Sequence, residues 1–190
     1  AHEMDFASLR YFRRKPAQML GEVPTSTVVN LSEVFGTEND TQRFATRYLK
    51  TTHCDLFFAD AAILVEGPAE RMLVPHFIRL NFEKLNGSYL SLLEIGGSHA
   101  HRLKPLIEHL GLITLIITDL DSVDASINNS AAQPIRGNKY ITNNDTLKTW
   151  VPENRKIDEL LDMKPSQKIK KYDDFFSIRV AYQCPVEVKI

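Results

Sequence analysis

The chain has 190 residues, of which 43% are hydrophobic and 25% charged, and its formal net charge is −1. This composition is ordinary for a soluble globular protein of one domain, and the near-neutral charge gives no sign of nucleic-acid binding. No apolar run approaches the ~20 residues that cross a bilayer, and the polar beginning lacks a signal peptide, so we expect a cytoplasmic protein. The cysteines, Cys54 and Cys184, are too few for a disulfide framework or a cysteine-rich zinc site.

Residues 1–58 are expected to form a leading segment, and residues 59–190 the main domain. Within the leading segment, residues 6–14 and 25–34 have the character of two strands. Residues 40–58 are predicted to be a helix, because Asp40 is suited to cap it and apolar side chains recur along it.

An alternation of buried strands and helices begins near residue 60. The pattern predicts strand, helix, strand, helix and strand over residues 61–65, 69–85, 88–95, 101–110 and 112–118. Gly111 follows the second helix in the position where glycine ends helices. Such an alternation is typical of parallel strands with right-handed crossovers, so we expect an α/β fold with a parallel sheet core flanked by helices.

The remainder of the chain is less regular. Residues 122–145 are polar and rich in Asn and Ser, which predicts a long loop. Short helices are expected over residues 145–150 and 155–162, and a further strand over residues 176–182. The helices would form an insertion before the last strand.

Acidic residues follow two of the predicted strands. Glu66 comes directly after the first strand, with Glu70 in the first turn of the next helix, and Asp119 and Asp121 follow the third strand. Ligands gather at the carboxyl ends of strands in open parallel sheets. Taken alone, Glu70 also suits a helix N-terminus and Asp119 a turn or cap, so those simpler readings stay open for each residue.

The combination of these acids favours a metal site. Clustered carboxylates repel one another, and hard divalent cations relieve that repulsion because Mg²⁺ and Mn²⁺ prefer oxygen ligands. Two such ions about 4 Å apart stabilise both the attacking and the leaving oxygens of a phosphodiester. The sequence therefore indicates phosphoryl transfer with water as the nucleophile.

The same motifs resemble a known family. Glu66-Gly67-Pro68-Ala69-Glu70, the strand end Gly96-Gly97 and Asp119-Leu120-Asp121-Ser122 are similar to the Toprim catalytic region of class 2 OLD-family (overcoming lysogenization defect) nucleases. Residues 144–152 and 178–183 extend the likeness. The resemblance implies a metal-dependent DNA endonuclease that nicks and cleaves by a two-metal mechanism, with phage defence as the role at the level of the family.

The resemblance also assigns roles to residues. It implies that Glu66, Glu70, Asp119 and Asp121 are the catalytic, metal-binding acids, with Mg²⁺ or Mn²⁺ as cofactor and Ca²⁺ as a non-catalytic substitute. Ser122 and Asp124 are additional candidate ligands. Gly67 and Gly97 would allow close approach of the backbone.

The sequence departs from the family pattern in two respects. Family members carry a Ser-Phe-Glu-like acidic motif and a lysine after the last strand, and no such motif follows here, so we expect the Toprim domain to be incomplete at its C-terminus. OLD proteins also pair this domain with an N-terminal ABC-type ATPase, yet the chain has no phosphate-binding loop. Residues 1–58 would then link to an ATPase domain of the same polypeptide. A homodimer of the full-length protein is a further expectation.

Basic residues provide candidates for contacts with DNA phosphates. They are Arg10, Arg13, Arg14, Arg136 and Lys139. The lysine-rich residues 164–171 are more simply explained as a solvated face, and His99 and His101 as residues at the start of a helix. Two alternative functions remain: a topoisomerase- or primase-type Toprim domain, and a non-catalytic module that binds DNA or assembles with an ATPase.

Overall fold

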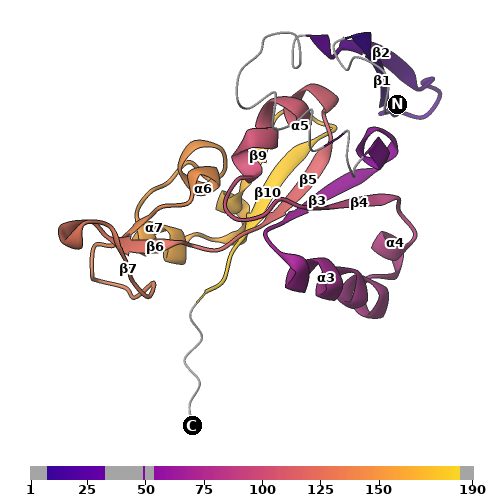
Figure 1. Cartoon of the computed structure of the whole chain (residues 1–190). Coiled ribbons are helices and arrows are strands. Elements are labelled where there is room, and N and C mark those ends of the chain that lie inside the picture. Colours follow the sequence, from indigo (N-terminus) through magenta and orange to yellow (C-terminus); the bar gives the residue numbers. More distant parts are fainter. Residues whose placement is uncertain (1–7, 33–48, 50–53, 185–190) are drawn as a thin grey trace.

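The computed structural model describes residues 8–32, 49 and 54–184. Its centre is a five-stranded sheet with the order β4-β3-β5-β10-β9 (Figure 1). The strands are β3 (Ala61–Val65), β4 (Leu90–Glu94), β5 (Ile113–Ile117), β9 (Ile169–Lys171) and β10 (Ser177–Ala181). All neighbours are parallel except β9, which is antiparallel to β10 at the edge. The expected α/β fold with a mostly parallel sheet is thus confirmed.

Strand β3 lies in the interior of this sheet, between β4 and β5. Its apolar sequence is buried almost throughout, as expected for a strand covered on both faces. Val65 pairs with Glu94 of β4, and Leu64 pairs with Ile116 of β5. This register brings the carboxyl ends of the three strands level with one another.

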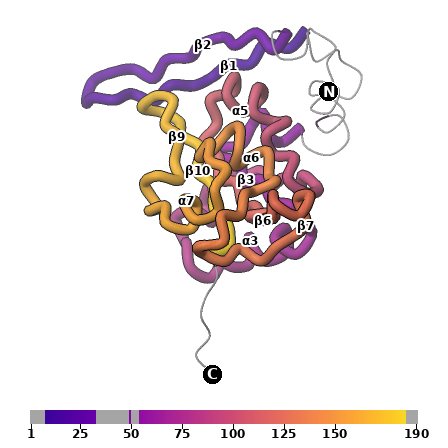
Figure 2. The backbone as a smooth tube through the Cα atoms, turned by 90° about the vertical axis from the view of Figure 1, so that its left-hand side faces the viewer, coloured from indigo at the N-terminus to yellow at the C-terminus, as the bar shows by residue number. Residues whose placement is uncertain are grey.

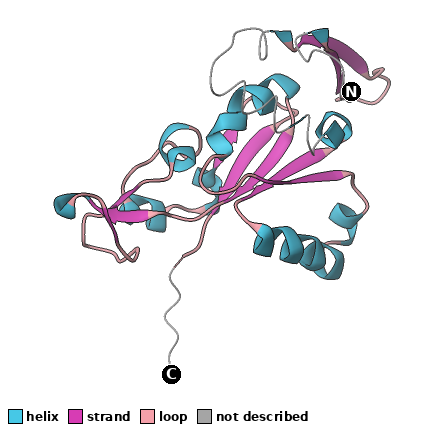
Figure 3. Ribbon diagram, in the orientation of Figure 1, coloured by secondary structure: helices cyan, strands magenta, loops and turns pink. Residues whose placement is uncertain are grey.

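The helices that follow β3 and β4 differ in how they pack. Helix α5 (Lys104–Leu110), preceded by the 3₁₀ turn η3 (Ala100–Leu103), buries Leu106, Ile107 and Leu110. Gly111 ends it with φ of 62°, as the sequence predicted. Helices α3 (Pro68–Asn81) and α4 (Glu83–Asn86) lie on another side of the sheet and bury no residue (Figures 1 and 3). The single helix expected over residues 69–85 is thus two helices, α3 and α4, separated at Phe82.

An open apolar cavity of about 710 Å³ separates α3 and α4 from the sheet. Its walls include Ile63, Phe77, Leu85 and Ile113. These side chains come mainly from the amino-terminal parts of β3 and β5 and from the helices, so the cavity is distinct from the carboxyl ends of the strands.

The prediction of a long loop over residues 122–145 is wrong. This stretch forms a small antiparallel sheet of β6 (Ser122–Asp124), β7 (Ser130–Ala131) and β8 (Ile141–Thr142), with the 3₁₀ turn η4 (Ala125–Ile127) after β6. Asn128 and Asn129 adopt positive φ of 49° and 54°, and they turn the chain back from β6 to β7. Asparagine tolerates this left-handed conformation better than most residues, so its abundance here marks a turn rather than an irregular loop.

The two short helices expected next are present as α6 (Asp145–Thr149) and α7 (Ile157–Asp162). The lysine-rich residues form the 3₁₀ turn η5 (Pro165–Lys168) and strand β9. The side chain of Trp150 is completely buried beside these elements, and its indole N–H donates to the Tyr172 hydroxyl at 3.2 Å. Within the described parts of the chain, no helix has the length and apolarity that crossing a bilayer requires.

The leading segment contains an antiparallel hairpin of β1 (Arg10–Lys15) and β2 (Thr25–Asn30), which confirms the two expected strands. Figure 2 shows this hairpin crossing one end of the molecule. Arg13 fixes it to the main domain through an ion pair of 2.8 Å with Asp173 and a contact with the Phe176 ring. Most of the helix expected over residues 40–58 lies outside the described residues, and η2 (Cys54–Phe58) is its described end. The domain boundary at residue 58 stays a prediction.

Candidate metal centre

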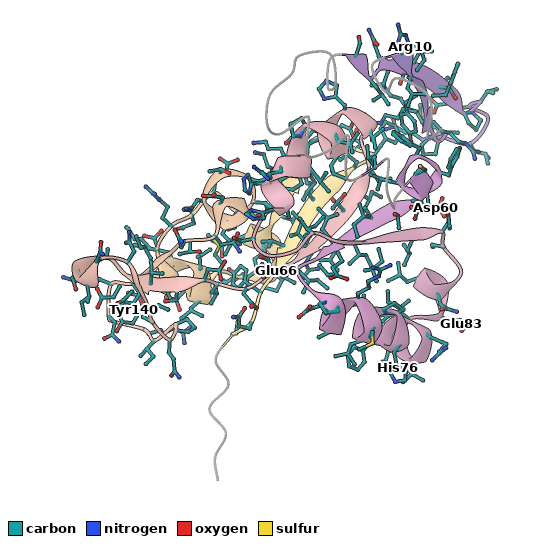
Figure 4. The ribbon with its side chains drawn as sticks, viewed as in Figure 1. Arg10, Asp60, Glu66, His76, Glu83 and Tyr140 are labelled. Carbon is teal, nitrogen blue, oxygen red and sulfur yellow. The ribbon has the colours of Figure 1, made fainter. Side chains whose placement is uncertain are left out.

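Glu66 lies where the ends of three strands meet. Its Oε1 atom accepts a hydrogen bond from the backbone N–H of Asp119 at 3.1 Å and another from the hydroxyl of Thr118. Its carbonyl accepts from the N–H groups of Gly96 and Gly97 at 3.1 and 3.3 Å. These glycines have φ of 71° and 79°, a conformation that glycine adopts at little cost. Figure 4 shows Glu66 at the opposite end of β3 from Asp60.

The Asp119-Leu120-Asp121 segment is held by residues 142–144, which we name the 142–144 clamp. Its three successive carbonyls each accept one hydrogen bond from the clamp: Asp119 from Asn144 Nδ2 at 2.9 Å, Leu120 from Thr142 Oγ1 at 2.6 Å, and Asp121 from the N–H of Asn143 at 2.8 Å. Strand β5 ends at Ile117, and the segment after it is no longer extended at Asp121, which has a positive φ of 43°.

The acids of this edge influence one another electrostatically. Burial raises the pKa of the Glu66 carboxyl, and the charges of Asp121 and Asp119 raise it further, against the hydrogen bonds from Thr118 and Asp119. Burial also raises the pKa of Asp121, with the charge of Asp119 as the next cause. Burial and the neighbouring negative charges therefore disfavour the ionised forms of Glu66 and Asp121, and a cation would favour them.

Glu70 has a different local role in this structure. It lies in the first turn of α3, where its Oε2 atom accepts from the N–H of Gly67 at 3.2 Å. This bond satisfies a free donor at the helix start, which is the simpler of the two roles that the sequence allowed. Among residues 8–32, 49 and 54–184, no three His, Cys, Asp or Glu side chains are grouped closely enough to hold a metal ion. A complete ligand set is thus not preformed there.

The two additional candidate ligands also differ from each other. The Asp124 carboxylate is exposed and accepts from the N–H and hydroxyl of Ser126 at 2.8 and 2.6 Å, which lowers its pKa. It caps η4. Ser122 is buried in β6, and in the described part of the chain its hydroxyl has no hydrogen-bond partner. The two therefore differ in burial: Ser122 has a buried hydroxyl without a partner, whereas both hydrogen bonds of Asp124 go to its Oδ1 atom.

Several residues at this edge have contacts with the acidic segment that the sequence did not predict. Thr118 and Asn144 bond directly to the acidic segment, and Lys148 of α6 has its ammonium 2.7 Å from Asp145 and a charge that lowers the pKa of Asp121. Asn144 and Lys148 lie within residues 144–152, which the family resemblance includes without giving them a role, and Asn144 is also a favourable N-cap residue before a short helix. The N-cap preference of Asn144 predicts the helix, but it does not predict the contact of Asn144 with the acidic segment.

The candidate DNA-binding residues are divided between two places. Arg10, Arg13 and Arg14 lie on the hairpin, and Figure 4 shows Arg10 far from Glu66. Arg13 is already paired with Asp173. Arg136 pairs with Asp162 at 2.9 Å, and Lys139 is exposed with φ of 57°; both lie between β7 and β8. The structure does not gather them around the acids.

Glu66 follows β3 and Asp119-Leu120-Asp121 follows β5 in a mostly parallel sheet, which is consistent with the fold of a Toprim domain. Residues 57–121 match the family described as "Overcoming lysogenization defect protein-like, TOPRIM domain", so this part of the chain is an OLD-like Toprim domain. The chain is also 36% identical over 121 residues to Endonuclease GajA of Bacillus cereus. That alignment covers 62% of this chain but 17% of the relative's length.

Proposed function

We propose that this chain is the catalytic region of a metal-dependent DNA endonuclease, a hydrolase that nicks and cleaves DNA. The observation that carries the proposal is that the Glu66 carboxylate, directly after β3, accepts from the Asp119 N–H and is influenced by the charges of Asp119 and Asp121, inside an OLD-like Toprim domain. The likeness to a protein named an endonuclease supports hydrolysis of DNA rather than another Toprim reaction.

The chemistry of the acids fits a hard divalent cation, because burial and mutual repulsion raise the pKa values of Glu66 and Asp121, and a cation would reverse both effects. Glu66, Glu70, Asp119 and Asp121 would hold two ions of Mg²⁺ or Mn²⁺, with Ser122 and Asp124 as further oxygen donors. Such ions supply an activated water and stabilise negative charge on phosphodiester oxygens. Glu70 would exchange its bond with Gly67 for this role.

The chain's own groups orient the acids. Thr118 and the Asp119 N–H hold the Oε1 atom of Glu66, and the 142–144 clamp holds the Asp119-Leu120-Asp121 backbone. The Lys148 ammonium lies near Asp121 and would moderate the negative charge that an incoming phosphate meets. Arg10, Arg14 and Lys139 would contact the DNA backbone away from the acids.

The match to a small share of a longer relative supports a further proposal about the whole protein. Residues 1–58 would connect the Toprim domain to an ABC-type ATPase of the same polypeptide, residues 59–190 would form the catalytic domain, and the protein would act in the cytoplasm in phage defence. A homodimer of the full-length protein is part of this proposal.

The direct test is cleavage of supercoiled plasmid by the full chain with Mn²⁺. We expect nicked and linear products, and Asp119→Ala should abolish them, whereas Asp174→Ala, at an exposed aspartate after β9, should cut normally. Undiminished cutting by the Asp119 variant would refute the site. Salt-sensitive DNA binding without any cutting would favour the non-catalytic module instead.

A further inference from the structure

Asn144 connects the 142–144 clamp to the acidic edge through both ends of its amide. Its Nδ2 group donates to Thr118 Oγ1 at 2.7 Å and to the Asp119 carbonyl at 2.9 Å. Its Oδ1 atom accepts from the N–H groups of Thr146 and Leu147 at 2.9 and 3.3 Å. The side chain is completely buried, and both of its ends are satisfied. A rotated amide would lose all of these bonds, so the network fixes its orientation.

The bond from Asn144 also fixes the direction of the next hydrogen bond. Because Thr118 Oγ1 accepts from the Asn144 amide, its own proton is free to be donated, and it is donated to Glu66 Oε1. The result is a directed series of donors from Asn144 through Thr118 to Glu66. The Asp119 N–H donates to the same carboxylate oxygen, so this oxygen is doubly held.

We propose that Asn144 and Thr118 are positioning residues, which orient the Glu66 carboxylate and the Asp119 backbone for a divalent cation. The inference rests on the proposed metal site. Groups that bond to metal ligands in this way fix the ligand's orientation, and their loss weakens metal binding by about 10–100-fold. Since Asn144 is also the N-cap of α6, the arrangement of the acids depends on the docking of that helix.

Four substitutions separate positioning from simple stability. Asn144→Ser keeps an N-cap oxygen for α6 but removes the amide donors. Thr118→Val keeps the branched shape and removes the hydroxyl, whereas Thr118→Ser restores a hydroxyl. Thr114→Val is the matched control, because Thr114 is a buried threonine of β5, the strand that Thr118 directly follows, and its hydroxyl donates elsewhere, to the Leu112 carbonyl at 2.8 Å.

The measurements are calorimetric titration of the full chain and its variants with Mn²⁺, and thermal unfolding without the ion. We expect Asn144→Ser and Thr118→Val to weaken Mn²⁺ binding by about 10–100-fold. Thr118→Ser should recover most of the affinity, and Thr114→Val should bind Mn²⁺ like the unaltered chain even where its melting temperature falls.

The outcomes distinguish this inference from the proposed function. Thr118→Val binding Mn²⁺ as tightly as Thr114→Val would overturn the positioning role, even if the unaltered chain cuts DNA. An unaltered chain that binds Mn²⁺, loses affinity in the expected variants and yet leaves plasmid intact would support positioning and overturn the nuclease. Absence of Mn²⁺ binding by the unaltered chain would overturn both.

Discussion

Helices α3 and α5 follow neighbouring strands of one sheet, yet they are held very differently. Helix α5 buries three apolar side chains in the main core, whereas α3 buries none and exposes Met72, Leu73 and Phe77. The acids divide in a similar way. Asp119 and Asp121 follow β5, an interior strand of the sheet, and their backbone is held by the 142–144 clamp, while Glu70 is carried by α3.

This difference indicates how the proposed metal site would be assembled. Elements with few buried contacts open at lower free energy than a packed core does. The backbone of Asp119 and Asp121 would therefore already be in position before an ion binds. Glu70 and the start of α3 would shift when the ion binds. Three experiments test whether the two helices and their acids differ in this way.

The largest expected effect concerns stability on the two sides of the sheet. Leu106→Ala in α5 removes a completely buried side chain and should lower the free energy of unfolding by about 2–5 kcal/mol. Leu73→Ala in α3 removes a side chain that is 50% exposed, and it should change that free energy by roughly 0.5 kcal/mol or less. Chemical denaturation of both variants measures the difference, and equal losses would contradict the contrast between the helices.

A second effect concerns Glu70 and separates its two roles. Glu70→Gln retains an oxygen for the Gly67 N–H but loses the charge that a cation requires. We expect the rate of plasmid cutting to fall by at least the ~10–100-fold known for groups that merely support metal ligands, with an unchanged melting temperature. Glu83→Gln, in the first turn of α4, is the matched control. Normal cutting by Glu70→Gln would leave Glu70 as a helix cap alone.

The smallest effect is the pH dependence of stability without divalent ions. The folded-state pKa of Glu66 is raised, so the native state holds more protons than the unfolded state between the ordinary and the raised pKa. The contribution of Glu66 to stability should therefore fall as pH rises through that window. Glu66→Gln removes this contribution, and the unaltered chain should lose stability relative to it as pH rises.

Chemical denaturation with a chelator, from about pH 4 to pH 7, measures this difference. Adding Mn²⁺ should restore stability to the unaltered chain at the upper end of the range, because a ligand that binds only the native state stabilises it. If the difference in unfolding free energy between the unaltered chain and Glu66→Gln does not vary with pH, burial and neighbouring charge do not destabilise the ionised Glu66 carboxylate.

Local patterns in the sequence determined the framework of this protein. The apolar runs of β3 and β5 predict strands, Pro68 begins a helix, and Gly111 ends one, because each depends on residues close in the chain. Burial on both faces holds for β3, whereas β5 leaves Ile113 exposed. The placement of Glu66 and Asp119 at one edge follows from the same patterns, since parallel strands align their carboxyl ends. The turn at Asn128 and Asn129 was also signalled locally, but it was misinterpreted as part of a loop.

The hydrogen bonds that hold the acids depend on contacts between residues far apart in the chain. Asn144 meets Thr118 across 26 positions of sequence, and Arg13 meets Asp173 across 160. No periodicity records such contacts, because they depend on how whole elements pack after each has formed. The same holds for α3, whose residue pattern predicts a helix but not the open cavity beside it. Local propensity therefore gave the strands and their acids, and long-range packing determined which side chains orient them.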